Sequence, residues 1–241
     1  MNIKALIFDL DGVLTDTAKY HYLAWKKLAD ELGFYFDEDI NELLKGVSRI
    51  NSFEIILQKN NATDKFTPEE KETLANKKND YYKEMIEQLT PDDILDGIVP
   101  FINEARQNGV KCAVASISKN APRVLQLLKI EDMFDYIADA ALVKKPKPAP
   151  EIFLTCAEAL GFAPNECVGI EDAQAGIESI HGAGMLSVGI NVAITSVAPD
   201  IILKSTAELD FKKISEFCWF KTVLFIRAVL CYMLYNFGNC I

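Results

Sequence analysis

An excess of basic residues is absent from this sequence of 241 residues, since 25 Lys and Arg stand against 35 Asp and Glu and the formal net charge is −10. Nucleic-acid binding needs a positively charged surface, so this balance argues against a nucleic-acid partner and leaves anionic ligands to a few local cations. Compositional bias is absent as well. With 50% apolar and 25% charged residues, the chain is neither collagen-like, low-complexity nor disordered, and it is long enough for one large domain or two modest ones.

Paired cysteines are also missing. The six cysteines include no CxxC pair and no spacing typical of zinc ligands, and three of them, Cys112, Cys156 and Cys167, fall in segments predicted as buried strand or helix. No secretion signal precedes the first predicted strand. We therefore expect free thiols and a reducing, cytoplasmic location.

An uncharged run long enough to cross a bilayer is not present either. Residues 217–241 are strongly apolar and carry only Lys221 and Arg227 as charges, but the run from Ala228 to Ile241 has 14 residues, short of the roughly 20 that a span needs. A longer span would place Arg227 near mid-membrane, at a cost of about 3 kcal/mol. We therefore expect an apolar tail that packs locally or is poorly ordered, and a monomeric protein with no membrane role.

Short apolar strands alternate with helical patterns along most of the chain. The helical patterns lie at about Ile98–Asn108, Asn120–Leu128, Pro150–Leu160 and Ala173–Gly182. The strands are mostly apolar throughout, as in a parallel sheet covered on both faces. This alternation predicts an α/β fold with a Rossmann-like parallel sheet. The predicted strands are Ile3–Leu10, Val110–Ser116, Tyr136–Ala138, Cys167–Ile170, Leu186–Ile190 and Ile201–Leu203.

A helical insertion separates the first two predicted strands. Trp25, Leu28, Ala29 and Leu32 have the spacing of one face of an amphipathic helix, and further helical patterns follow to about residue 88. Because the insertion is too long for a crossover connection, we expect a separate domain. The predicted division is a catalytic core of residues 1–14 and 91–216, a helical cap of residues 15–90 and an apolar tail of residues 217–241.

Polar residues follow the predicted strands in a pattern that suggests one site. Asp9 and Asp11 come directly after the first strand, and ligands of α/β sheets bind at the carboxyl ends of strands. Nucleotide-binding loops of the GxxxxGK[ST] and GxGxxG types are absent after that strand. Three further features follow in order, namely Ser116 after the second strand, Lys147 in a proline-rich loop and the pair Glu171-Asp172 after a later strand.

This set of residues suits phosphoryl transfer. Clustered carboxylates repel one another unless a cation binds, and Mg2+ prefers such oxygen ligands together with substrate phosphate. The ammonium of Lys147 and the hydroxyl of Ser116 provide hydrogen-bond donors for phosphate oxygens. One carboxylate can then attack phosphorus while its neighbour moves a proton.

The four motifs, in this order, resemble those of the haloacid dehalogenase superfamily. The resemblance implies that Asp9 is the nucleophile and Asp11 the general acid/base. It also implies a bound Mg2+, whose ligands would be Asp9, the carbonyl of Asp11 and Asp172, with Glu171 close by or ligating. The transferring phosphate would be held by Ser116 and Lys147.

The helical insertion narrows the resemblance to the β-phosphoglucomutase family, through the segments 15–25, 44–49 and 77–80 and the core segment 115–120. That family interconverts β-D-glucose 1-phosphate and D-glucose 6-phosphate through an aspartyl phosphate and β-glucose 1,6-bisphosphate. The resemblance implies that His21 and Lys78 couple cap closure to Asp11. The phosphate that is not transferred would be bound by Arg49 with Ser118, Lys119 and Asn120, and further substrate contacts are expected at Thr17, Trp25, Gly46, Val47 and Ser48.

One departure and two alternatives stand beside this interpretation. Ala173 follows Asp172 where a small hydroxyl residue is common, which weakens the surroundings of the metal. A Mg-dependent sugar-phosphate or phosphoglycolate-type phosphatase would have the same core with water as the acceptor. A non-catalytic binding or membrane-tethered protein is suggested only by the tail, and the intact acidic motif argues against it.

Overall fold

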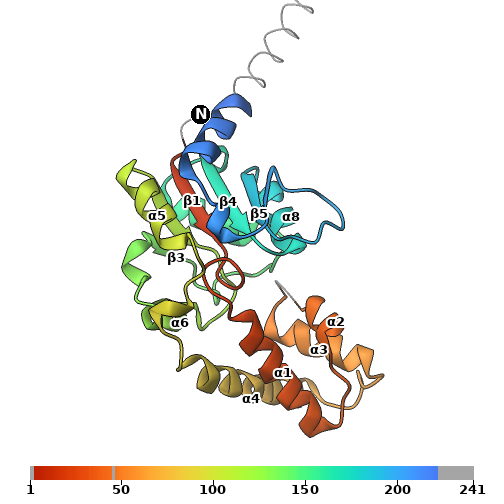
Figure 1. Ribbon diagram of the computed structural model, residues 1–241. Coiled ribbons are helices and arrows are strands. Elements are labelled where there is room, and N and C mark those ends of the chain that lie inside the picture. The colour runs from red at the N-terminus through yellow and green to blue at the C-terminus, as the bar shows by residue number, and fades with distance from the viewer. Residues whose placement is uncertain (1–2, 45–46, 222–241) are drawn as a thin grey trace, which may run out of the picture.

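A six-stranded parallel sheet lies at the centre of the computed structural model, which describes residues 3–44 and 47–221 (Figure 1). The strand order is β3-β2-β1-β4-β5-β6, and every neighbouring pair is parallel. All six predicted strands are present, so the predicted α/β fold is confirmed. Their bounds are β1 Ala5–Phe8, β2 Lys111–Val114, β3 Tyr136–Ile137, β4 Cys167–Glu171, β5 Leu186–Ile190 and β6 Ile201–Leu203.

Helices cover both faces of the sheet because the central strands are apolar on both sides. Successive residues of a strand point to opposite faces, so Phe8 packs against Phe101 on one face while Ile7 lies in a second cluster with Phe153 and Ile177 on the other. The helices of the core are α5 Ile98–Gln107, α6 Ala121–Leu127, α7 Glu151–Leu160 and α8 Gln174–Gly182. Short 3-10 turns lie at Pro91–Asp93, Glu131–Met133, Pro164–Glu166 and Thr206–Glu208.

Four helices inserted between β1 and β2 lie to one side of the sheet, beyond the carboxyl ends of its strands (Figure 1). They are α1 Ala18–Leu32, α2 Glu38–Glu42, α3 Arg49–Lys59 and α4 Pro68–Ile86, and we call them the cap. Apolar side chains of the cap form a hydrophobic cluster of their own, in which Trp25 stacks on Phe53 with ring centroids 5.9 Å apart. The predicted domain boundaries at residues 15 and 90 stay a prediction.

The chain passes between core and cap at two places that lie side by side. The hydroxyl of Thr15 donates to the carbonyl of Asp93 at 2.7 Å, and the amide of Leu95 donates to the carbonyl of Leu14 at 3.0 Å. Cap and core are therefore connected through one pair of adjacent, hydrogen-bonded segments. Such an arrangement permits the cap to move about these segments as a unit.

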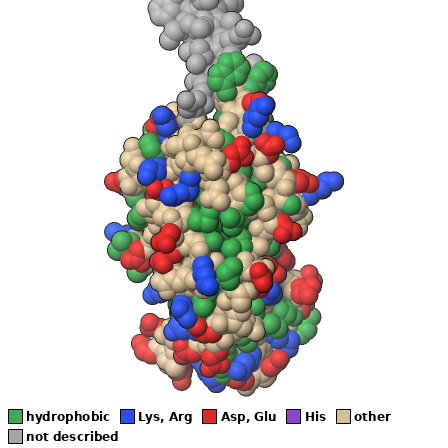
Figure 2. Space-filling view, turned by 60° about the vertical axis from the view of Figure 1, so that its left-hand side comes forward, with side chains coloured by type: hydrophobic (Ala, Val, Ile, Leu, Met, Phe, Trp, Pro, Cys, Tyr) green, Lys and Arg blue, Asp and Glu red, His purple; other side chains and the backbone are tan. Residues whose placement is uncertain are grey.

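The last described helix, residues 211–221, packs on the sheet through Phe211, Ile214 and Cys218. Its end exposes Trp219 and Phe220 to 59% and 56%, and Figure 2 shows apolar side chains next to the residues that are not described. Most of the predicted tail, residues 222–241, lies outside the described residues. Among the helices that are described, none is long and apolar enough to cross a membrane.

The described cysteines and charges agree with the expectations from composition. Cys112, Cys156 and Cys167 are buried free thiols, and Cys218 is buried as well. On the face shown in Figure 2, basic side chains are scattered among acidic ones and form no single basic patch.

Candidate functional site

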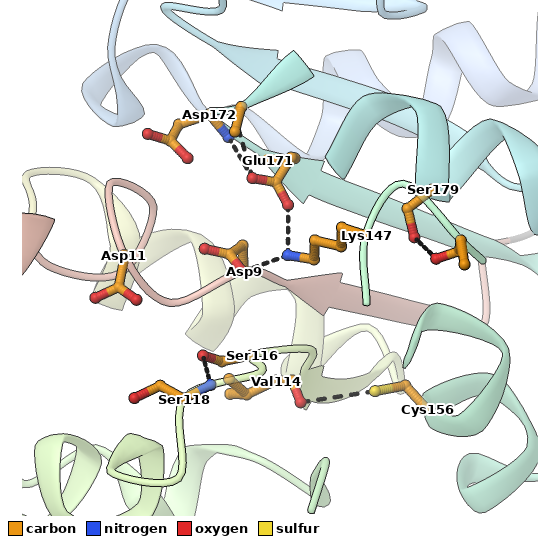
Figure 3. Close-up of polar contacts among 12 residues, drawn as sticks. Asp9, Asp11, Val114, Ser116, Ser118, Lys147, Cys156, Glu171, Asp172 and Ser179 are labelled. Atoms are coloured by element: carbon orange, nitrogen blue, oxygen red, sulfur yellow. Dashed lines mark hydrogen bonds and ion pairs between the residues drawn. The ribbon is translucent and has the colours of Figure 1, made fainter. Parts of the chain in front are cut away.

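The end of β1 places Asp9 at the centre of the site. Its amide donates to the carbonyl of Ile170 at 2.9 Å, which continues the pairing between β1 and β4 by one residue. The residue is only 7% exposed, and its carboxylate pairs with the ammonium of Lys147, which also pairs with Glu171 at 2.7 Å (Figure 3). Two carboxylates from adjacent strands thus share one buried lysine.

Two glycines provide the space that the acidic groups at the end of β4 occupy. A Cβ on Gly176, in the first turn of α8, would lie 2.0 Å from a carboxylate oxygen of Glu171. A Cβ on Gly12 would lie 2.2 Å from an oxygen of Asp172, and Gly12 has φ +82°. Larger residues at these two positions would displace the carboxylates, so the DxDG turn and α8 are both shaped around the acidic pair.

Asp9, Glu171 and Asp172 form a cluster that could hold a metal ion. Each offers a carboxylate oxygen, and the three oxygens lie within 4.8 Å of one another. Burial, and then repulsion from Glu171, raises the pKa of Asp9 to about 6, although Lys147 acts in the opposite direction. Since burial and the charge of Glu171 both disfavour the ionised form of Asp9, a divalent cation with hard oxygen ligands would stabilise it.

The two members of the acidic pair differ in how they are held. Both oxygens of Glu171 already accept hydrogen bonds, one from Lys147 and the other from the amides of Asp172 and Ala173 at 3.2 and 3.1 Å. This arrangement favours Glu171 as a support for the metal site. Direct ligation by Glu171, and by the carbonyl of Asp11, stays a prediction.

The side chain of Asp11 points away from that of Asp9 (Figure 3). The Thr17 hydroxyl donates to one of its oxygens, and Nε2 of His21 lies 3.9 Å from the other. Burial, followed by the charge of Asp9, raises the pKa of Asp11 to about 6. A carboxyl group with such a pKa exchanges protons readily near neutral pH, as a general acid/base must.

A chain of contacts runs from Asp11 into the cap. Nδ1 of His21 lies 2.7 Å from the ammonium of Lys78, and the His21 ring stacks on Tyr82 at 4.0 Å between centroids. Lys78 is 2% exposed, and its ammonium lies 4.9 Å from the centroid of the Trp25 ring. Burial lowers the pKa of Lys78 to about 7 and that of His21 well below its usual value. The lowered pKa favours neutral His21, and if Lys78 donates to Nδ1, the ring proton lies on Nε2, towards Asp11.

In the loop after β2, serine hydroxyl groups accept hydrogen bonds from backbone amides. The hydroxyl of Ser116 accepts from the amide of Ser118 at 3.2 Å, and the hydroxyl of Ser118 accepts from the amide of Asn120 at 3.3 Å. Ser116 is 3% exposed and lies close below Asp9 in Figure 3. These bonds fix residues 116–120 beside the carboxyl end of β1.

Arg49 faces this loop from the cap. It is the first residue of α3, whose first turn carries no acidic residue, and Ser48 is the N-cap that accepts from the amide of Asn51 at 3.4 Å. Its guanidinium donates to the side chain of Asn76 at 3.0 Å. Burial lowers the pKa of Arg49, and a cation at a helix N-terminus is unfavourable by itself. An anion bound there would offset both costs.

One cavity of about 980 Å³, open solvent at its mouth included, joins all of these groups. Of the predicted site residues, Thr17 and Ser48 do not line it, and Gly46 lies outside the described residues. Thr17 reaches the site through Asp11, while the substrate contact of Ser48 stays a prediction. The predicted residues that do line the cavity are Asp9, Asp11, His21, Trp25, Val47, Arg49, Lys78, Ser116, Ser118, Lys119, Asn120, Lys147, Glu171 and Asp172.

Sequence reasoning assigned no role to several residues of the cavity wall. Asn79 belongs to the buried stripe of α4, together with Ala75, Lys78, Tyr82 and Ile86. A polar residue in an otherwise buried helical stripe is a signal that could have identified it. The other lining residues without a predicted role are Ala18, Asn41, Leu44, Ser52, Ile117 and Ala173.

Comparison with known proteins agrees with this geometry. A family model for haloacid dehalogenase-like hydrolases matches residues 3–184. The chain is 44% identical over 214 residues to β-phosphoglucomutase of Bacillus subtilis, covering 89% of this chain and 95% of that protein. It is 31% identical over 188 residues to a fructose-1-phosphate phosphatase of Escherichia coli, covering 78% and 96%. The crystal structure of β-phosphoglucomutase from Clostridium difficile matches with a TM-score of 0.87 and 45% identity, covering 92% of this chain and 99% of that one.

Proposed function

The chain belongs to the haloacid dehalogenase-like hydrolase family, and we propose that it acts as a β-phosphoglucomutase, interconverting β-D-glucose 1-phosphate and D-glucose 6-phosphate. One observation carries the proposal. A single cavity is lined by the carboxylate of Asp9, the candidate nucleophile, and by Arg49 of the cap, the candidate for binding a second phosphate. A mutase needs two phosphate positions, because its bisphosphate intermediate must bind in both orientations.

In the proposed reaction, phosphorylated Asp9 donates its phosphoryl group to one oxygen of the sugar monophosphate, which gives the bisphosphate. After the bisphosphate turns round, Asp9 takes a phosphoryl group back from the other sugar oxygen. Lys147 and Ser116 hold the oxygens of the transferring phosphate, since both are buried beside Asp9. Asp11 gives a proton to the departing sugar oxygen and removes one from the attacking hydroxyl. Its contacts with Thr17 and His21 place it between core and cap, so its position depends on cap closure.

We propose Mg2+ as the metal, held by Asp9 and Asp172 with Glu171 in support, because the cluster contains only carboxylate oxygens. When bound, the ion supplies positive charge to the transferring phosphate. Lys147 also supplies positive charge to this cluster, since its ammonium pairs with the carboxylates of both Asp9 and Glu171.

Water must be excluded, because an aspartyl phosphate that meets water is hydrolysed. The cap supplies an apolar wall for this purpose through Trp25, Leu44 and Val47. A phosphatase would instead admit water to the aspartyl phosphate. The 31% identity to a fructose-1-phosphate phosphatase keeps that activity as the second candidate.

The deciding experiment supplies β-glucose 1-phosphate, a trace of β-glucose 1,6-bisphosphate and Mg2+. Phosphorus NMR then follows glucose 6-phosphate and free phosphate together. A mutase converts most of the substrate to glucose 6-phosphate with little free phosphate. Release of phosphate in step with substrate loss would refute the proposal in favour of the phosphatase.

We also propose that the protein is a cytoplasmic monomer. The buried free thiols of Cys112, Cys156 and Cys167 support a reducing compartment. Sedimentation of the purified chain at micromolar concentration tests the monomer, and a mass of twice 26.9 kDa would refute it.

A further inference from the structure

Asn79 joins the cap to the core inside the cavity. It lies on α4, and its side-chain oxygen accepts from the amide nitrogen of Asn120, in the core loop, at 2.8 Å. Each residue is 8% exposed, and both line the cavity. A buried hydrogen bond between two neutral side chains from different parts of the fold therefore lies in the wall of the substrate site.

Asn120 makes this contact and lacks the one that is usual at its position. It is the N-cap residue of α6, a position where Asn ordinarily accepts from a backbone amide of the first turn. Here its side chain makes no such capping bond. The side chain turns to the cap instead, although the loop amide of Asn120 stays bound to Ser118.

The geometry fixes the direction of the Asn120 amide group. An amide nitrogen carries two hydrogens, and Asn79 binds one of them. The plane of the amide, and thus the direction of the second hydrogen, is then set by a residue of the cap. When the cap moves about its two connecting segments, this constraint is made or lost.

We propose that Asn79 is a positioning residue for the distal phosphate, the one that is not transferred. Because Asn79 holds Asn120 only when the cap lies against the core loop, phosphate binding by the loop and closure of the cap stabilise one another. The proposal rests on the proposed function in one respect, since it needs a substrate with a second phosphate.

A second contact between the same two helices provides a matched control. Arg123 of α6 pairs with Glu87, the residue that follows α4, through two parallel hydrogen bonds. These side chains are about half exposed and lie outside the cavity lining. Arg123→Ala therefore breaks a cap-to-core contact without touching the substrate site.

The test compares KM for β-glucose 1,6-bisphosphate with KM for acetyl phosphate, which carries no second phosphate. We expect Asn79→Ala to raise KM for the bisphosphate by about threefold to tenfold, the equivalent of one neutral hydrogen bond, and KM for acetyl phosphate by less than about twofold. Arg123→Ala should change both constants by less than about twofold. In an Asn120→Ala background, Asn79→Ala should cause no further loss, because Asn79 acts through Asn120.

Three outcomes would overturn the proposal. Equal losses with both phosphate donors would mean that Asn79 only supports the fold, and no loss would mean that the contact is idle. Losses that multiply in the double variant would mean that Asn79 acts independently of Asn120. Should Asn79→Ala fail to fold, Asn79→Asp keeps an oxygen for Asn120 and is expected to raise KM for the bisphosphate selectively, through repulsion of the distal phosphate.

Failure of the proposed function is detected separately. If the wild-type protein hydrolyses the bisphosphate without interconverting the glucose phosphates, the mutase proposal is wrong. The comparison of KM values is then made on that hydrolysis, whose substrate still carries a second phosphate, so the role of Asn79 is decided in either case.

Discussion

The sheet edge and the cap face the same cavity with opposite charge. At the sheet edge, Asp9 and Glu171 share the ammonium of Lys147 and Asp172 completes the acidic cluster, whereas the cap contributes the cations Arg49 and Lys78. The sheet edge therefore lacks positive charge, which a metal ion would supply, and the cap lacks negative charge, which a phosphate would supply. One ligand that carries a phosphate at each end and binds with a metal ion satisfies both.

The two regions also differ in how firmly they hold their side chains. Groups at the sheet edge are fixed by strand pairing and by close backbone contacts, as at Asp9 and Glu171. Groups of the cap depend on the position of the cap relative to the core. Substitutions at the sheet edge should thus affect every phosphoryl donor, and substitutions in the cap should affect those with a second phosphate.

The largest effect is expected at Asp9. Asp9→Asn should abolish turnover of both β-glucose 1-phosphate and acetyl phosphate, because an amide neither attacks phosphorus nor serves as a charged metal ligand. Steady-state assays with both donors measure this, and an unchanged unfolding midpoint shows that the fold is kept. Near-native activity of Asp9→Asn would contradict a covalent mechanism.

The next largest effect is expected for Asp11→Asn. We expect kcat of the mutase reaction to fall by about a hundredfold to ten-thousandfold, the usual contribution of general acid/base catalysis, while KM changes little. The raised pKa of Asp11 supports its part in proton transfer. A rise in KM with kcat unchanged would instead assign Asp11 to substrate binding.

Arg49→Ala sharpens the contrast between the two regions. Losing a bidentate guanidinium–phosphate pair should lower kcat/KM for the glucose phosphates by roughly a hundredfold to a thousandfold. Hydrolysis of acetyl phosphate should change little, since it has no second phosphate. Arg106→Ala, an arginine on α5 that pairs with Asp135 outside the cavity lining, is the control and should leave both reactions unchanged. Equal losses on both donors would mean that Arg49 supports the cap fold.

The sequence predicts the sheet edge better than the cap, for a physical reason. Asp9, Ser116 and Glu171 each follow a strand, and the carboxyl ends of parallel strands meet at one edge, so position along the chain fixes position in space. The order of the strands and the burial of Lys147 are seen only in the structure. The sequence pattern does not predict the direction in which each side chain points. An example is Asp11, whose carboxylate accepts a hydrogen bond from Thr17.

The cap depends on contacts between helices that are distant in sequence. Spacing along α1 predicts which face is apolar, but it does not indicate that Lys78 of α4 lies against His21. Those residues came from a family resemblance, and Asn79, which a buried stripe would have revealed, received no role. Helix periodicity identifies a face, whereas the residue opposite that face is set by tertiary packing.

The smallest expected effect is on the free energy of unfolding, which burial of the Lys78 ammonium in the cap should lower. The pKa of Lys78 is about 7 in the folded protein and about 10.5 in the unfolded chain, so below pH 7 both states bind the proton and above it only the unfolded state does. The folded state therefore gains stability as pH rises from 7 to 10, by at most about 1.4 kcal/mol per pH unit.

Lys78→Met removes this dependence, and Lys77→Met is the control because Lys77 is half exposed and pairs with Glu31. Urea unfolding at pH 7 and pH 9 should show the wild-type free energy of unfolding rising by about 1 kcal/mol or more relative to Lys78→Met, with no such rise relative to Lys77→Met. A parallel course of wild type and Lys78→Met would show that the cap carries its buried charge without cost. In that case the cap, unlike the sheet edge, would need no ligand to balance its charge.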